Sequence, residues 1–105
     1  MNFVTISNRK FAGSQRLGAI YFKGGTASTS QFTFIDGECV EFTNDEMSRI
    51  PMNRIRSLSL SGIYSYIGYD VESNSILIKN DMIGRIPIFV FNKSGVFIIS
   101  NSIWE

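Results

Sequence analysis

The residues that most often perform covalent chemistry in proteins are scarce in this chain. It has no histidine and a single cysteine, Cys39. Without histidine, the Ser-His-Asp and Cys-His mechanisms and histidine acid–base catalysis are excluded, as are the common zinc sites. A lone cysteine also excludes an internal disulfide. We therefore predict a protein that is not an enzyme and that uses no cofactor and no metal.

An Asp36-Gly37 pair stands between two runs of residues, 31–35 and 38–42, in which polar and apolar side chains alternate. A two-residue type I′ turn needs positive φ at both central positions, and Asp-Gly is a preferred pair for it. The pattern predicts a β-hairpin. The carboxylates elsewhere stand mostly in turns or at a helix start, where hydrogen bonds to the backbone explain them.

Basic residues form two clusters in the sequence. The first is Arg9-Lys10 with Arg16, and the second is Arg49 with Arg54 and Arg56. Side chains two positions apart in a strand point to the same face, so we expect Arg54 and Arg56 to make a patch able to bind RNA or single-stranded DNA. A solvated surface explains the same residues. The net charge of only +1 argues against nucleic acid as the main partner.

The elements that must position these groups belong to one domain. The chain has 105 residues, of which 44% are hydrophobic and 18% are charged. This length suits a single domain over residues 1–105, and this composition excludes intrinsic disorder. No apolar run approaches the ~18 residues of a membrane helix, and the first residues do not have the pattern of a signal peptide. We expect a cytoplasmic protein with no membrane partner.

Most of the chain has the two-residue periodicity of strands, with turns about every 8–12 residues. The expected strands are 2–7, 17–23, 31–35, 38–42, 55–60, 62–69, 75–79, 86–91 and 96–100, with a loop over 24–30. One short helix is expected to begin at Thr43 or Asn44 and to end before Pro51. The fold class is therefore α+β, mainly antiparallel β, with two sheets and one short helix.

The last two expected strands are apolar with almost no alternation. Such strands are usually buried on both faces, which predicts an internal core between two layers; the alternative is a face that contacts a partner. Pro87 cannot donate to a sheet, so its strand should lie at an edge or begin after the proline.

Residues 61–105 resemble the later half of the glutaminase domain of class II glutamine amidotransferases, especially the asparagine synthetase type. Order and spacing match this family over about 45 residues, where motifs of strands and turns follow one another. The matching positions are Gly62, Ile63–Asp70, Ile76–Ile78, Asn80-Asp81, Gly84, Pro87–Val90, Gly95 and Ile99–Asn101. The resemblance implies a reduced Ntn-hydrolase-like fold with facing antiparallel sheets. It also implies that Asp36, Gly37 and Glu38 correspond to the Asn-Gly-Glu that binds glutamine in that family, although a plain turn explains them too.

The chain departs from this family where the catalysis takes place. Active members use an N-terminal cysteine as nucleophile and its own amino group as base. Here Asn2 follows Met1, the arginine of the family's Arg-Asp is Asn80, and the glutamate of its Ala-Ser-Glu is Asn101. The resemblance therefore implies common ancestry of the fold without glutaminase activity.

These observations favour a non-catalytic module that binds another protein or a second copy of itself, because the chain is rich in aromatic residues and poor in charge. The expected contact residues are Phe89, Phe91, Phe97 and Trp104. Two alternatives remain open: a weak nucleic-acid binder that uses the second arginine cluster, and a remnant or accessory subunit of an amidotransferase-like synthetase that binds an amide near Asp36.

Overall fold

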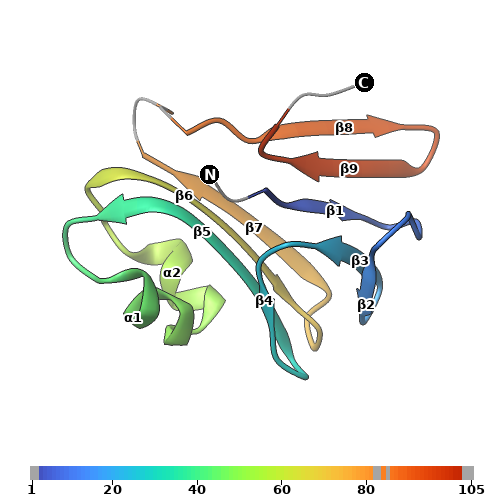
Figure 1. The fold of residues 1–105 in the computed structure, drawn as a ribbon. Coiled ribbons are helices and arrows are strands. Elements are labelled where there is room, and N and C mark those ends of the chain that lie inside the picture. The colour runs from blue at the N-terminus through green and yellow to red at the C-terminus, as the bar shows by residue number, and fades with distance from the viewer. Residues whose placement is uncertain (1–2, 82–83, 85, 103–105) are drawn as a thin grey trace.

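The chain folds into two antiparallel sheets and two short helices (Figure 1). The computed structural model describes residues 3–81, 84 and 86–102. The predicted fold class, α+β with mainly antiparallel strands in two sheets, is confirmed. Within the described residues no helix has the length and apolar character needed to cross a membrane.

The five-stranded sheet is built from both ends of the chain. Its strands, in spatial order, are β2 (Gln15–Leu17), β3 (Ile20–Lys23), β1 (Thr5–Ser7), β9 (Val96–Ser100) and β8 (Phe89–Lys93). β8 lies at an edge and begins after Pro87, as the proline predicts. The expected strand 17–23 is divided between two strands by a turn at Gly18-Ala19.

The four-stranded sheet comes from the middle of the chain. Its order is β4 (Thr26–Ala27), β5 (Gln31–Cys39), β6 (Gly62–Asp70) and β7 (Ser75–Asn80). β4 lies inside the segment expected to be a loop. β5 and β6 pair over all nine residues of each, from Gln31↔Asp70 to Cys39↔Gly62.

This long pairing corrects the hairpin predicted at Asp36-Gly37. β5 runs straight through the pair, and residues 40–42, expected in a second strand, lie beyond its end. Gly37 does take a positive φ of 80°, but it does so inside the strand, opposite Tyr64. A Cβ at this glycine would lie 2.2 Å from the Ile63 carbonyl oxygen, so only glycine fits there.

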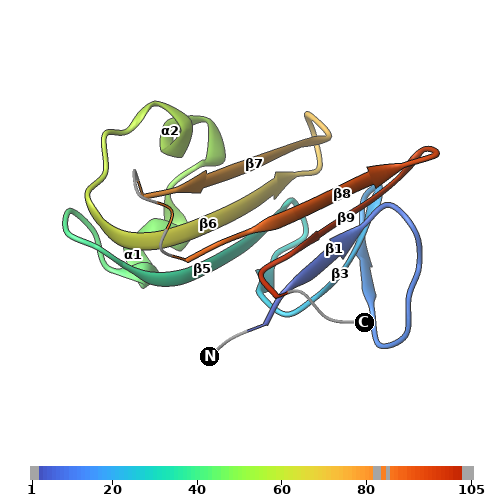
Figure 2. The ribbon, with the colours of Figure 1, turned by 90° about the horizontal axis from the view of Figure 1, so that it is seen from above.

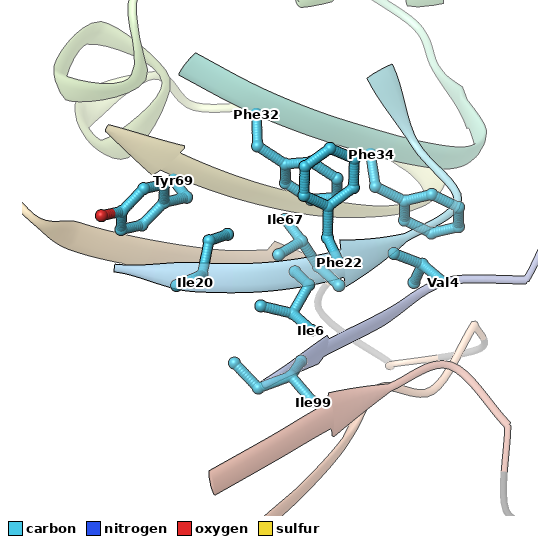
Figure 3. Close-up of a cluster of buried hydrophobic side chains, with 9 residues drawn as sticks. All are labelled: Val4, Ile6, Ile20, Phe22, Phe32, Phe34, Ile67, Tyr69 and Ile99. Carbon is cyan, nitrogen blue, oxygen red and sulfur yellow. The ribbon is translucent and has the colours of Figure 1, made fainter. Parts of the chain in front are cut away.

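The sheets face each other across a shared core (Figure 3). Every other residue of a strand points to one face, which places Ile6 of β1 and Ile99 of β9 toward the four-stranded sheet. Phe22 of β3 meets Phe32 of β5 with ring centroids 4.9 Å apart. The buried members are Val4, Ile6, Ile20, Phe22, Phe32, Phe34, Ile67, Tyr69 and Ile99.

Two helices, rather than the one expected, follow β5. α1 (Asn44–Arg49) begins with a capping box, because the Thr43 hydroxyl accepts from the Glu46 amide at 3.1 Å and the Glu46 carboxylate accepts from the Thr43 amide at 2.8 Å. α2 (Met52–Ser57) begins immediately after Pro51. The strand expected over 55–60 is therefore wrong.

The helices cover the outer face of the four-stranded sheet, the face turned away from the five-stranded sheet (Figure 2). Met47, Met52 and Ile55 from the helices pack against Tyr64 and Tyr66 of β6, and all five are buried. We call this surface the helix-covered face. The resulting order of layers is helices, four-stranded sheet, five-stranded sheet.

Candidate binding face of the five-stranded sheet

The outer face of the five-stranded sheet, turned away from the shared core, can be derived from strand register. Residues directly opposite one another in antiparallel strands point to the same side. Ile99 and Ile6 are opposite each other and point into the core, so their sequence neighbours point outward. Two outward rows follow, Arg16–Tyr21–Ser7–Ile98–Phe91 and Lys23–Thr5–Ser100–Phe89.

Large apolar side chains on this outer face are open to solvent. Phe91 is 56% exposed and Ile98, directly across from it, is 39% exposed. The prediction that β8 and β9 are buried on both faces is therefore wrong. Only part of their inward surface packs in the core, and Val90, at the sheet edge, is also exposed.

A groove of about 960 Å³ lies over this face. Its floor includes Thr5 and Ser7 of β1 with Val96 and Ile98 of β9, and all four point outward. Among the described residues, the lining consists of Phe3, Val4, Thr5, Ser7, Arg9, Lys10, Phe11, Ala12, Lys23, Gly24, Val96, Ile98 and Ser102. We call it the cationic groove, because three of these residues are basic and none is acidic.

Hydrogen bonds hold one wall of the cationic groove, the segment that joins β1 to β2. The Asn8 amide nitrogen donates to the Gly95 carbonyl oxygen at 2.8 Å, and the Phe97 amide donates to the Asn8 side-chain oxygen at 3.1 Å. Further along, the Ser14 hydroxyl donates to the Phe11 carbonyl at 2.6 Å. Asn8 thus ties this wall to the β8–β9 hairpin.

The basic residues of the groove stand on this wall and on the neighbouring strand. Arg9 and Lys10 come from the wall, and Lys23 ends β3; all three are exposed. Among the described residues the one ion pair lies elsewhere, between Arg49 and Asp45 at 2.9 Å. The three cations therefore remain available to an anionic ligand. Arg16, predicted in the same cluster, lies instead over the Tyr21 ring at 5.7 Å.

The residues predicted to contact a partner do not all lie on one face of the sheet. Phe91 and Phe89 share the outer face, exposed and half-buried respectively. Phe97 points the other way and packs against the shared core, so it does not belong with them. Trp104 lies outside the described residues. Ile98, Phe3 and Phe11 also line the groove on this face, and the sequence does not predict this because the pairing of β1 with β9 joins segments far apart in the chain.

The residues predicted to bind an amide ligand are extended along β5. Asp36 and Glu38 lie on one side of the strand, opposite Ser65 and Ile63, and Gly37 lies between them. The Asp36 carboxylate accepts from the Gly37 amide at 2.9 Å. These residues therefore make no turn that would surround a ligand, and the amide site stays a prediction.

The predicted arginine patch does not form as expected. Arg54 and Arg56 are on α2, where residues two positions apart point to different sides of the helix. Arg49 is on α1 and pairs with Asp45. All three are exposed, and nucleic-acid binding by them stays a prediction. No group of three potential metal ligands occurs among the residues that the structure describes.

Comparison of the chain with protein-family models, with curated proteins and with solved structures gives no match.

Proposed function

We propose that this protein is a non-catalytic binding module whose partner is another protein, and that the partner covers the outer face of the five-stranded sheet. The observation that carries the proposal is the pair Phe91 and Ile98, two large apolar side chains that lie side by side and remain open to water. Exposed apolar surface next to polar residues is typical of protein interaction sites.

The resemblance to glutaminase domains agrees with this proposal. Two facing antiparallel sheets are what the resemblance implies, and the chain has such sheets. Its only cysteine, Cys39, ends β5, where the thiol donates to the Phe42 carbonyl oxygen at 3.1 Å. We therefore propose a degenerate glutaminase-like scaffold that has kept the fold and now serves binding.

Affinity capture with three forms of the full chain tests the proposal. Wild type and Val40→Asp should retain the same protein from a lysate of the source cells, and Ile98→Asp should lose it. Val40 is 78% exposed and lies beyond the end of β5, so its variant controls for adding an aspartate at an exposed apolar position. Retention of every captured protein by Ile98→Asp would contradict the proposal.

A further inference from the structure

The chemistry of the cationic groove specifies what kind of segment fills it. We infer that the partner inserts an acidic amphipathic helix, whose apolar side lies on Val96, Ile98 and Phe11 and whose carboxylates meet the basic residues of the groove. The inference rests on the proposed function and adds the chemical class of the bound segment.

The charge of the groove favours an acidic ligand. Arg9, Lys10 and Lys23 line the groove, and none of the thirteen lining residues that the structure describes carries a carboxylate side chain. The apolar lining residues would bind an apolar ligand of any charge. The cations favour a ligand with carboxylates beside its apolar side, since an opposite potential speeds encounter and sets specificity.

The position of the groove on the face of the sheet favours a helix over an extended segment. The groove lies on the face of a sheet, whereas an added strand would pair with a free edge such as β8 and leave the groove open. The same molecule also shows how a sheet face is covered. On the helix-covered face, Met47 and Ile55 of short helices pack on Tyr66. A helix is about 10–12 Å wide with its side chains and presents one apolar side to such a groove.

Two other occupants fit the groove less well. A symmetric dimer that buries this face would bring two sets of Arg9, Lys10 and Lys23 into one interface, and the described lining of the groove supplies no carboxylate to offset their repulsion. An anionic membrane is a flat surface, whereas this site is a hollow lined by the segment that joins β1 to β2 as well as by strand residues. A helix is only about 10–12 Å wide and is therefore better suited to such a hollow.

The test is selection of random sixteen-residue peptides, displayed on phage, against the immobilised full chain. Four variants are used as counter-targets. Ile98→Asp changes the floor, and Val40→Asp is its control. Arg9→Glu with Lys10→Glu reverses two charges of the groove. Arg54→Glu with Arg56→Glu is its control, because it makes the same change in net charge on exposed positions of α2.

We expect enriched peptides with apolar residues at positions i, i+3, i+4 and i+7 and with an excess of acidic residues. Fluorescence anisotropy of the synthesised peptides should show binding weakened at least about tenfold by Arg9→Glu with Lys10→Glu, and unchanged within about twofold by its control. Binding should also weaken as salt rises. The circular dichroism spectrum of a bound peptide should become helical.

Other outcomes separate this inference from the proposed function. Peptides that need Ile98 but are basic or neutral, or that bind as extended chains, would overturn the acidic helix and leave the binding face in place. If no enriched peptide depends on Ile98, the acidic helix fails, and the capture experiment with Ile98→Asp decides the proposed function separately. Sedimentation that shows a dimer lost in Ile98→Asp would assign the face to a second copy. Pelleting of wild type with phosphatidylserine vesicles, but not of Arg9→Glu with Lys10→Glu, would assign the groove to a membrane surface.

Discussion

The two sheets of this protein differ in how their outer faces, the faces turned away from the shared core, are covered. On the helix-covered face, Tyr64 and Tyr66 are buried under α1 and α2. The outer face of the five-stranded sheet has no helix over it within the described part of the chain (Figure 2), and Phe91 and Ile98 on this face are exposed. Both surfaces arise from the same alternation of side chains along strands. Within its described residues, the chain therefore covers one apolar face with its own helices and leaves large apolar side chains of the other exposed.

The largest expected effect is the loss of packing under the helices. Replacing Ile55, which is fully buried, with alanine should lower the free energy of unfolding by about 2–5 kcal/mol, because a cavity remains. The matched change Ile98→Ala on the outer face should cost less than about 1 kcal/mol. Urea unfolding of the two variants measures the difference. Equal losses would mean that the outer face is already covered in the isolated chain.

A second change crowds the helix-covered face. A Cβ at Gly68 would lie 2.7 Å from the Tyr66 hydroxyl oxygen and 3.1 Å from a side-chain carbon of Met52. Gly68→Ala should therefore destabilise the protein by about 1–3 kcal/mol, as overpacking usually does. Thermal unfolding followed by circular dichroism provides the measurement. An unchanged midpoint would show that α2 moves away from the sheet without cost.

A smaller effect is expected at the start of α1. Thr43→Ala removes the hydroxyl that accepts from the Glu46 amide, which should cost about 1 kcal/mol. Since α1 holds the buried Met47, amide hydrogen exchange should rise in α1 more than in β9. Uniform acceleration in both elements would show that helix and sheets unfold together.

The smallest expected effect on stability is that of Tyr66, and it appears only at high pH. Burial under the helices raises the pKa of Tyr66 to about 12, against the opposing influence of the Thr33 hydroxyl. The native state therefore holds this proton more tightly than the unfolded state, whose pKa is 10.0. The resulting stability is complete below pH 10 and is lost as pH rises toward 12. Denaturant-induced unfolding, measured at several pH values over this range, should show this decline in wild type and a weaker one in Tyr66→Phe. If stability fell equally steeply with pH in both proteins, this role of Tyr66 would be contradicted.

The strands that the sequence predicts well are those with local signals. β6, β7 and β9 follow from their residue types and from the turns between them. The predictions that were wrong concern residues whose type is compatible with two different local structures. Pro51 ends one helix but also precedes the next, in which Met52 and Ile55 have helical spacing. Asp36-Gly37 has the composition of a turn, but nine residues of pairing with β6 keep it in a strand.

The candidate binding face was less predictable for a physical reason. The cluster Arg9-Lys10 and the strand that contains Ile98 are visible in the sequence, but nothing local shows that they meet. Their meeting depends on the pairing Ser7↔Ile98 and on the two hydrogen bonds of Asn8. Contacts between distant parts of a chain leave no periodic pattern.

The pairing of β1 with β9 also sets an order of events during synthesis on the ribosome. The four-stranded sheet and its helices need only residues 26–80, so this middle region can assemble while the C-terminal hairpin is still being made. β1 is made first but must wait for β9, and the Val4 amide must wait for Asn101, whose side chain accepts its hydrogen bond at 3.0 Å. Contacts so distant in sequence slow folding. Closure of the five-stranded sheet is therefore the late step, and it completes the cationic groove at the same moment.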